Sequence, residues 1–230
     1  MKSMQILEML GSTLKVYSRV SLERKPKMRL SNTSQKNIFL SFYSESEGKT
    51  KEAAVLVPLF YKNDSLHILL TKRAQKVEHH KGEISFPGGA KDIEDNSLEE
   101  TALRETQEEV GILSSDIKIL GILDDVFTLA SHFLVTPYVG IIPYPYNFQS
   151  NFQEIEEILE IPFSFFLLEE NYWEGSFSYK ENTIPSYFFQ WRKDIIIWGI
   201  TGHIIKNLCN IVKNNLLITE PGCEFFLEKR

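Results

Sequence analysis

The sequence predicts a single α/β domain with a helical extension at its N-terminal end. Three observations lead to this fold class: short apolar runs bounded by turn residues, a capped amphipathic segment at 96–110, and an apolar segment at 195–212. Runs of the first kind are typical of strands, and the two longer segments carry apolar residues at helical spacing. Strand and helix signals that alternate along one chain favour an α/β domain.

Length, composition and charge limit the classes of function. The chain has 230 residues, of which 43% are hydrophobic and 24% charged, so it can bury a sizeable core. Its formal net charge of −6 disfavours sequence-independent binding to nucleic acid. No apolar stretch reaches the roughly 18 residues of a membrane-spanning helix, and the N-terminus lacks a secretory signal pattern. We therefore expect a cytoplasmic protein whose two cysteines, Cys209 and Cys223, are reduced.

The N-terminal part divides from the rest by its pattern. We expect an extension with its linker over 1–50 and a main domain over 51–230. Apolar residues at helical spacing over 1–20 predict an amphipathic helix that packs on the main domain, although Gly11 weakens that pattern. Residues 21–36 are rich in Lys, Arg, Ser and Asn and predict a connecting loop. One role for such an extension is contact between two copies of the chain in a homodimer.

The next segments predict strands and a glycine loop. The apolar runs 53–60 and 66–71 flank Lys62-Asn63-Asp64, which is the signal of a strand–turn–strand unit. Residues 83–86 form a further short strand, stopped by Pro87-Gly88-Gly89.

Residues 96–110 give the clearest helix prediction. Asn96 or Ser97 can cap its start, with a glutamate three residues further on, and Gly111 can end it. Its buried stripe is expected to consist of Leu103 and Val110, helped by Ala102 and Thr106. Apolar runs then predict strands at 117–123, 133–141 and 155–161, and a last helix at 195–212 entered from a strand at 187–191.

Three carboxylates stand close together near the end of the 96–110 helix. Glu105, Glu108 and Glu109 lie at i, i+3 and i+4, so their side chains share one face. Like charges so placed repel one another, and a divalent cation would relieve that repulsion. Hard oxygen ligands suit Mg²⁺ or Mn²⁺, with a backbone oxygen from Gly89 as a further ligand. Arg104 can pair with one of the carboxylates and fix its rotamer. The alternative interpretation is a solvated acidic helix face.

This segment resembles the signature of the Nudix hydrolases. Residues 104–112 read Arg-Glu-x-x-Glu-Glu-x-Gly-Ile after a glycine loop, as that signature does. The spacing departs from the commonest form, because one extra residue precedes Arg104 and Asp95 stands where glutamate is usual. That longer pattern is similar to the pattern of the coenzyme A pyrophosphatase branch. This chain departs from it at one position, because Glu78 stands where the branch pattern has an arginine. The matching positions are Leu69–Ala74, Gly82, Ser85–Gly89, Asp92, Asp95, Thr101–Ala102, Arg104–Glu105 and Glu108–Glu109, with similar segments at 120–125, 135–140 and 197–201.

The resemblance implies a fold, a reaction and a set of ligands. The fold would be an α/β/α sandwich with a mixed sheet. The reaction would be metal-dependent hydrolysis of coenzyme A or its thioesters to phosphopantetheine and adenosine 3′,5′-bisphosphate, with water attacking phosphorus. Glu105, Glu108 and Glu109 would bind Mg²⁺ or Mn²⁺, with the Gly89 carbonyl as a fourth ligand. The alternatives are another Nudix substrate (ADP-ribose, NADH, a dinucleotide polyphosphate or a damaged nucleotide) and a Nudix-fold binding module without catalysis.

Further residues are candidates for substrate contact and for a catalytic base. Lys81, Arg73 and Ser85 lie near the glycine loop in sequence and are expected to meet the phosphates of the nucleotide substrate. Family members often use a further acidic residue, for which the candidates are Glu154, Glu156 and Glu157. For Ser131, His132 and His203 a structural role is the better expectation.

Overall fold

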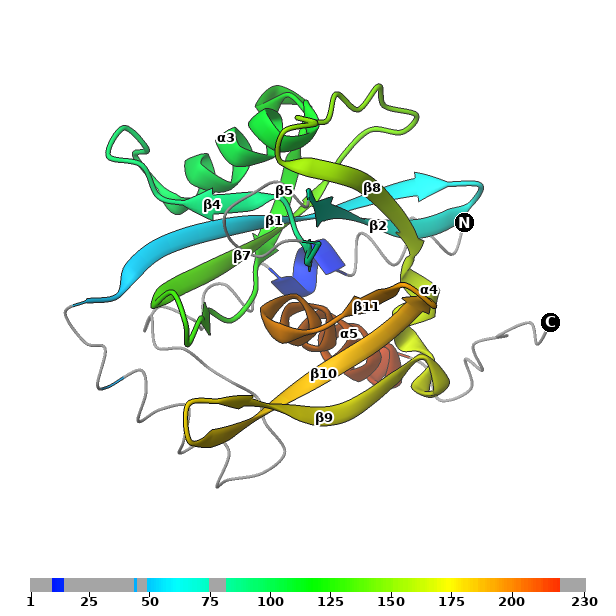
Figure 1. The fold of residues 1–230 in the computed structure, drawn as a ribbon. Coiled ribbons are helices and arrows are strands. Elements are labelled where there is room, and N and C mark those ends of the chain that lie inside the picture. Colours follow the sequence, from blue (N-terminus) through cyan, green and yellow to red (C-terminus); the bar gives the residue numbers. More distant parts are fainter. Residues whose placement is uncertain (1–9, 15–43, 45–48, 75–81, 220–230) are drawn as a thin grey trace.

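The computed structural model describes residues 10–14, 44, 49–74 and 82–219. Within these residues an eight-stranded mixed sheet and a three-stranded antiparallel sheet form the framework (Figure 1). The larger sheet consists of β1 (Lys51–Lys62), β2 (Ser65–Arg73), β3 (Ile84–Ser85), β4 (Gly88–Ala90), β5 (Lys118–Ile122), β6 (Val126–Phe127), β7 (Phe133–Ile141) and β8 (Ile155–Pro162). The smaller sheet and the helices are β9 (Tyr172–Tyr179), β10 (Asn182–Arg192), β11 (Ile195–Ile197), α3 (Leu98–Val110), α4 (Phe163–Leu167) and α5 (Gly199–Thr219).

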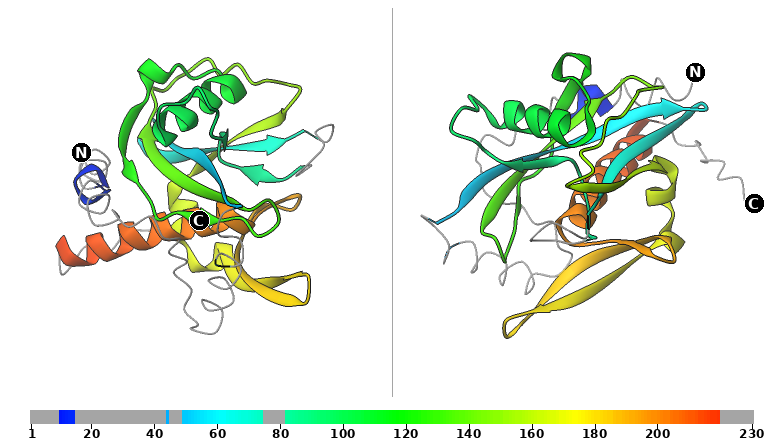
Figure 2. Two further views of the ribbon diagram at one scale, coloured as in Figure 1. Left: turned by 90° about the vertical axis from the view of Figure 1, so that its left-hand side faces the viewer. Right: turned by 45° about the horizontal axis from the view of Figure 1, so that its top comes forward.

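Helices cover both faces of the larger sheet, as the α/β/α prediction requires (Figures 1 and 2). Alternate side chains of β1 point to opposite faces. Leu56 shares an apolar cluster with Ala102 of α3, whereas Val57 shares a cluster with Leu208 of α5. The sheet is mixed because β1 pairs antiparallel with β2 and parallel with β7. The fold class is therefore confirmed.

The first two strands form the predicted hairpin. Lys62 pairs with Ser65 across a two-residue turn, in which Asn63 and Asp64 have φ angles of 50° and 59°. Two consecutive residues with positive φ match the right-handed twist of the flanking strands, and Asn and Asp tolerate that conformation. Three later strands were also predicted correctly, since 117–123, 133–141 and 155–161 correspond to β5, β7 and β8.

The glycine segment was predicted as a loop and is instead a short strand. Gly88–Ala90 forms β4, which pairs antiparallel with β1. Gly88 has a φ of 155°, and a Cβ at this position would lie 2.4 Å from the backbone oxygen of Ala54. Glycine in a strand marks such a close backbone approach, which the sequence alone does not distinguish from a turn.

The segment 195–212 was predicted as one helix, and this was wrong at its start. Ile195–Ile197 forms β11, paired with β10, and α5 begins at Gly199. Three consecutive β-branched residues favour a strand, and Gly199, with a φ of 65°, turns the chain into the helix. The strand expected at 187–191 is the end of the longer β10.

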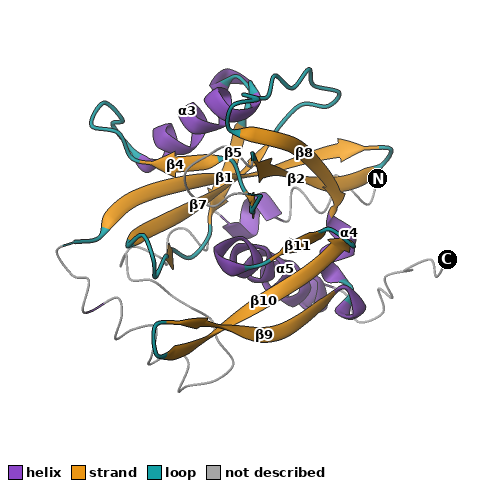
Figure 3. Ribbon diagram, in the orientation of Figure 1, coloured by secondary structure: helices purple, strands orange, loops and turns teal. Residues whose placement is uncertain are grey.

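Helix α3, drawn purple in Figure 3, has the predicted ends, and its buried stripe differs from the predicted one at Leu103. The Ser97 side chain accepts a hydrogen bond from the Glu100 backbone N–H, and Gly111 ends the helix in the left-handed conformation. Leu103 is only half-buried, whereas Leu98 and Thr101 are buried with Ala102, Thr106 and Val110. The prediction was correct for Ala102, Thr106 and Val110 and wrong for Leu103. The buried Thr101 was missed because it is polar, and its hydroxyl is buried in a hydrogen bond to Asp95.

The N-terminal extension is described only in part. Residues 10–14 are helical, and Leu10 and Leu14 are buried in the main core, as an amphipathic helix packed on the domain requires. The rest of 1–20, the linker expected at 21–36 and Cys223 lie outside the described residues, while Cys209 is a buried free thiol. No helix in the described part of the chain is long and apolar enough to cross a membrane.

Candidate active site

Helix α3 carries the predicted carboxylates along β4 and the start of β1. The Glu109 side chain is 4% exposed, that of Glu105 19%, and that of Glu108 59%. A Cβ on Gly89 would lie 2.5 Å from the carboxyl carbon of Glu105, so only glycine leaves room for that carboxylate against β4. The three side chains thus pass from solvent to the interior along one face of the helix.

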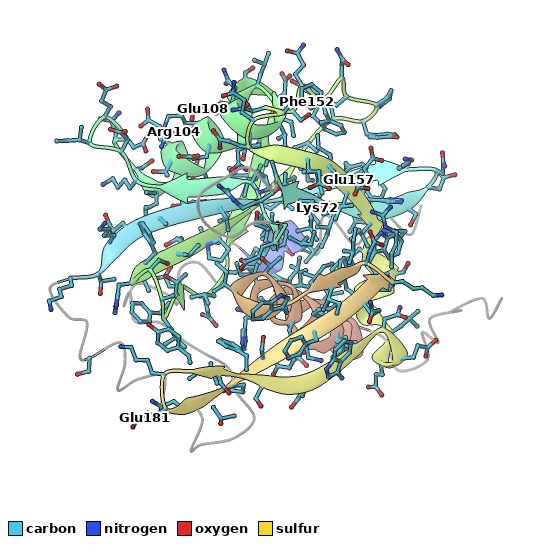
Figure 4. The ribbon with its side chains drawn as sticks, viewed as in Figure 1. Lys72, Arg104, Glu108, Phe152, Glu157 and Glu181 are labelled. Carbon is cyan, nitrogen blue, oxygen red and sulfur yellow. The ribbon has the colours of Figure 1, made fainter. Side chains whose placement is uncertain are left out.

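Arg104 links this face to the loop before the helix. Its Nη1 donates to Glu105 Oε1 at 2.9 Å and to Glu108 Oε2 at 3.2 Å. Its Nη2 donates to the Ala90 carbonyl at 3.3 Å and to Asp95 Oδ2 at 2.9 Å, and its Nε donates to Asp95 Oδ1 at 3.0 Å. Figure 4 shows Arg104 and Glu108 on the same helix. The arginine thereby restricts the rotamers of two carboxylates, as its position in the sequence led us to expect.

Asp95 is a buried carboxylate with a full set of partners. Besides Arg104, the Thr101 hydroxyl and the Asp92 backbone N–H each donate to its Oδ2 at 2.9 Å. The Arg104 guanidinium holds the pKa of Asp95 well below its usual range. In the sequence Asp95 departs from the commonest signature and matches the longer pattern, and in the structure both of its carboxylate oxygens accept from Arg104.

Glu109 lies deepest of the three carboxylates and has an unsatisfied oxygen. Arg73 Nη1 is 3.6 Å from its Oε1, and Arg73 and the Gly88 backbone N–H act to lower the pKa of this carboxyl. Among the described residues nothing hydrogen-bonds to the buried Oε2. Burial, with Glu105 nearby, raises the pKa of Glu109 to about 8, and burial also raises the pKa of Glu105.

These features fit a divalent cation. A buried carboxylate oxygen without a partner costs free energy that a cation would recover, and carboxylates are the ligands that Mg²⁺ and Mn²⁺ prefer. As they are placed here, no three acidic, histidine or cysteine side chains of the described residues stand close enough to hold a metal ion together. A cation bound by Glu105, Glu108 and Glu109 would therefore draw their carboxylates closer to one another.

The pairing of β4 with β1 decides which backbone oxygen faces the carboxylates. The Leu56 N–H bonds to the Pro87 carbonyl and the Lys91 N–H to the Glu52 carbonyl, and Ala54 lies opposite Gly89. Because paired residues in an antiparallel ladder alternate, the Gly89 backbone groups point to β1 and those of Gly88 point away. The register therefore favours the Gly88 carbonyl over the expected Gly89 carbonyl as a metal ligand.

The model of the NUDIX domain family matches residues 49–181. The chain belongs to the Nudix hydrolase family. A curated relative from Yersinia enterocolitica, named "Uncharacterized Nudix hydrolase NudL", is 37% identical over 161 residues, which cover 70% of this chain and 80% of the relative. A relative of the same name from Pectobacterium atrosepticum is 37% identical over 158 residues, covering 69% and 81%. A MutT/nudix family protein of known structure from Enterococcus faecalis has a TM-score of 0.47 and 17% identity, covering 80% of this chain and 76% of that one.

Membership of the Nudix hydrolase family identifies the chain as an enzyme. Nudix hydrolases act on nucleoside diphosphate derivatives and generally depend on a divalent metal, so this Nudix protein is a pyrophosphatase hydrolase of that kind. The alternative of a binding module without catalysis is therefore set aside.

Of the three residues expected to contact substrate, the structure describes Arg73 and Ser85. Arg73 ends β2 and contacts Glu109 of α3 (the Nudix helix, Leu98–Val110), rather than an acid on the surface, and its buried Nε has no partner among the described residues. The Ser85 hydroxyl on β3 lies 3.3 Å from that of Thr71. Lys81 and Glu78 lie outside the described residues.

The three acidic residues around β8 differ in their surroundings. Glu156 pairs with Lys72 at 2.7 Å, and both carboxylate oxygens of Glu157 accept from Arg192, at 2.8 and 2.9 Å. Glu154 instead is joined by its backbone to the segment that holds Glu109, because its N–H donates to the Asn151 carbonyl at 2.9 Å and the Asn151 N–H donates to the Glu109 carbonyl at 2.9 Å. Of the three candidates, the structure brings Glu154 to the site.

Two structural roles expected for histidines are consistent with the geometry. His203 on α5 is packed against Tyr187, with ring centroids 5.1 Å apart, and its Nε2 lies 3.3 Å from the Pro185 carbonyl. His132 is a turn residue with a φ of 57° before β7.

A hollow of about 440 Å³ runs along the outer face of the Nudix helix. It adjoins the carboxylate site through the side chains of Arg104 and Glu108. The hollow is lined by Asp95, Ser97, Glu99, Glu100, Leu103, Arg104, Gln107, Glu108 and Ser114.

Proposed function

We propose that this Nudix hydrolase cleaves the diphosphate of coenzyme A or its thioesters, giving phosphopantetheine, or its acylated form, and adenosine 3′,5′-bisphosphate. The observation that carries the proposal is the longer sequence pattern, whose parts meet in space. Arg73, from its first segment, contacts Glu109, and Asp95, from its longer loop, binds Arg104. Residues that distinguish this branch from the common signature thus lie against the carboxylates of the signature itself.

Glu105, Glu108 and Glu109 would hold Mg²⁺ or Mn²⁺, together with a backbone oxygen from the glycine strand. Of the two glycines, the register favours Gly88 over Gly89 for that oxygen. When bound, such a cation neutralises charge on the diphosphate and activates a water for attack on phosphorus.

The chain's own residues supply orientation and proton transfer. Arg104, held by Asp95, keeps the carboxylates of Glu105 and Glu108 on the side of the helix that faces substrate. Glu154 is our candidate for the additional carboxylate, either accepting the proton of the attacking water or serving as a further ligand. Arg73, Ser85 and Lys81 are proposed to contact the substrate phosphates.

A substrate panel tests the proposal. Purified protein is incubated with Mg²⁺ or Mn²⁺ and with coenzyme A, acyl-coenzyme A, ADP-ribose, NADH, dinucleotide polyphosphates and oxidised nucleoside triphosphates, and the products are separated by chromatography. We expect coenzyme A or its thioesters to give the highest kcat/KM. Efficient cleavage of another compound without cleavage of coenzyme A would exclude this proposal.

A second candidate has one observation in its favour. Glu78 replaces an arginine of the coenzyme A pattern, and a negative charge weakens contact with a polyanionic substrate. This replacement favours a different nucleoside diphosphate derivative. The variant Glu78→Arg separates the two, because it should raise kcat/KM for coenzyme A only if that residue contacts coenzyme A phosphates.

The metal ligands are tested by charge-neutral substitutions on one helix. Glu105→Gln, Glu108→Gln and Glu109→Gln should each lower kcat, by at least about 100-fold for the two more buried positions, which corresponds to about 2.7 kcal/mol of activation free energy. Glu99→Gln is the control, because Glu99 is exposed in the first turn of the same helix. Equal activity in the Glu109→Gln variant would contradict the assignment.

We also infer a cytoplasmic location and a homodimer. A buried free thiol at Cys209 is consistent with a reducing compartment. Cell fractionation tests the location, and size-exclusion chromatography with light scattering tests the dimer.

A further inference from the structure

The segment that carries Glu154 is tied to the C-terminal end of the Nudix helix. The Gln149 N–H donates to the Val110 carbonyl at 3.0 Å, and the Asn151 N–H donates to the Glu109 carbonyl at 2.9 Å. A Cβ on Gly111 would lie 2.8 Å from that of Gln149, so glycine permits this close crossing. The segment therefore satisfies carbonyls that the end of a helix leaves without intrahelical partners.

Asn151 uses all its polar groups at the centre of this crossing. Its carbonyl accepts from the backbone N–H groups of Glu154 and Ile155, at 2.9 and 2.8 Å. Its side-chain Oδ1 accepts from the Gln153 N–H at 3.1 Å, and its Nδ2 donates to Glu154 Oε1 at 3.2 Å. One residue thus joins the helix backbone, the turn and the carboxylate.

The other end of the turn is anchored on the sheet. The Ala74 N–H donates to the Glu154 carbonyl at 2.7 Å, directly after Arg73, whose side chain contacts Glu109. The backbone of Glu154 is therefore fixed between α3 and β2. Its side chain is exposed, and in the described part of the chain the donor to its carboxylate is Asn151. Phe152, at the tip of the same turn, is 83% exposed (Figure 4). A side chain so exposed does not hold the turn in place, and the hydrogen bonds of Asn151 do.

We propose that Asn151 is a positioning residue, which holds the Glu154 carboxylate beside the Nudix carboxylates through its side-chain amide. The inference rests on the proposed function only in giving Glu154 a part in catalysis. An amide is suited to this task, because its oxygen caps the turn while its nitrogen donates to the carboxylate. Partners that orient a catalytic group typically change activity by about 10–100-fold when removed.

The kinetic test is a double-mutant cycle between Asn151 and Glu154. Asn151→Asp keeps the oxygen that accepts from the Gln153 N–H but removes the donor to Glu154. We expect it to lower kcat by about 10-fold or more, with KM within about twofold. In the Glu154→Gln background the same substitution should change kcat by less than about twofold. An equal loss in both backgrounds would mean that Asn151 only holds the turn, and would overturn the inference.

A matched control and a measurement without turnover complete the test. Gln153→Ala, one exposed position away, should leave kcat within about twofold of the parent protein. In ¹H–¹⁵N spectra the side-chain amide signal of Asn151, assigned by its loss in Asn151→Ala, should move on Glu154→Gln while that of Gln153 stays in place. An unmoved Asn151 signal would exclude the contact. If the parent protein hydrolyses no nucleoside diphosphate derivative, the proposed function fails, and the spectra still decide the Asn151 contact.

Discussion

Arg104 and Asp95 form a bidentate ion pair, with Nε 3.0 Å from Oδ1 and Nη2 2.9 Å from Oδ2. The carboxylate side chain is 3% exposed and the guanidinium 30% exposed. Two parallel hydrogen bonds fix the plane of the guanidinium, and its remaining N–H groups reach Glu105 and Glu108. The carboxylate arrangement on α3 thus depends on a residue from the loop before the helix.

Asp95→Asn should destabilise the fold and lower activity together. The substitution keeps the shape but removes the charge that Arg104 faces, and we expect a loss of about 2 kcal/mol, below the value for a fully buried pair because Arg104 is partly exposed. Urea unfolding at pH 7 measures the loss. Because the pKa of Asp95 is lowered in the folded state, its contribution is present above the unfolded value of 3.8 and is lost as the pH falls. Parent and variant should therefore converge in stability at low pH.

Divalent cation binding should depend on pH through Glu109. Its pKa of about 8 in the metal-free protein means that the carboxyl is mostly protonated at pH 7, and binding a cation must displace that proton. The affinity for Mn²⁺, measured by electron paramagnetic resonance, should rise from pH 6 to pH 8 and level off above it. In Glu109→Gln the affinity should be weaker and the slope over this range smaller. An unchanged slope in the variant would mean that another group controls binding.

Substitution of Glu156 or Glu157, the two other acidic candidates, should leave activity nearly unchanged. Glu157 forms a two-point pair with Arg192, in which both side chains are more than one third exposed, so Glu157→Gln should change the stability of the fold little. We expect kcat of Glu157→Gln and of Glu156→Gln to stay within about twofold of the parent, and kcat of Glu154→Gln to fall by at least about 10-fold. Steady-state kinetics at saturating metal compares the three. A loss confined to Glu156→Gln would move the additional carboxylate to that position.

Most of the fold and part of the site could be predicted because local signals decide them. The Asn63-Asp64 turn and the Gly111 end are short-range features found at their predicted places, and Ser97 is one of the two residues predicted to cap the helix. The common face of Glu105, Glu108 and Glu109 could be predicted for the same reason, because their spacing along a helix determines it.

The errors concern features that depend on pairing between distant segments. Pro87-Gly88-Gly89 has the composition of a turn, and only the register with β1 makes it a strand in which the Gly88 backbone groups point away from β1. Likewise the sequence does not distinguish Glu154 from Glu157, because the contacts that separate them join distant segments: the Glu154 carbonyl accepts from Ala74, which follows β2, and the Glu157 carboxylate accepts from Arg192 of β10. Asn151 went unnoticed because it belongs to no motif, and its contacts with α3 exist only in the folded chain.

Gly89→Ala should lower activity while leaving the fold intact. The added Cβ would lie 2.5 Å from the Glu105 carboxyl carbon, and this flexible side chain can swing away at little cost to the backbone. We expect a melting temperature within about 3 °C of the parent and a loss of kcat of at least about 10-fold. Gly11→Ala is the control, because its Cβ would meet Leu120 at an ordinary 3.7 Å in a helical segment, and alanine should stabilise it by up to about 1 kcal/mol. Full activity in Gly89→Ala would show that Glu105 need not lie against β4.

Acid sensitivity of the fold should depend in part on His203. Its ring packs against Tyr187, and burial lowers its pKa from 6.5 to about 4. Because the unfolded chain binds a proton at higher pH than the folded one, the neutral ring contributes stability above pH 6.5, and this is lost as the pH falls toward 4. The difference corresponds to at most about 3 kcal/mol. His203→Gln keeps a polar group near the Pro185 carbonyl but cannot titrate, so its unfolding free energy should fall less than that of the parent between pH 7 and pH 4.5. Parallel curves for the two proteins in urea unfolding would assign the acid sensitivity to other groups.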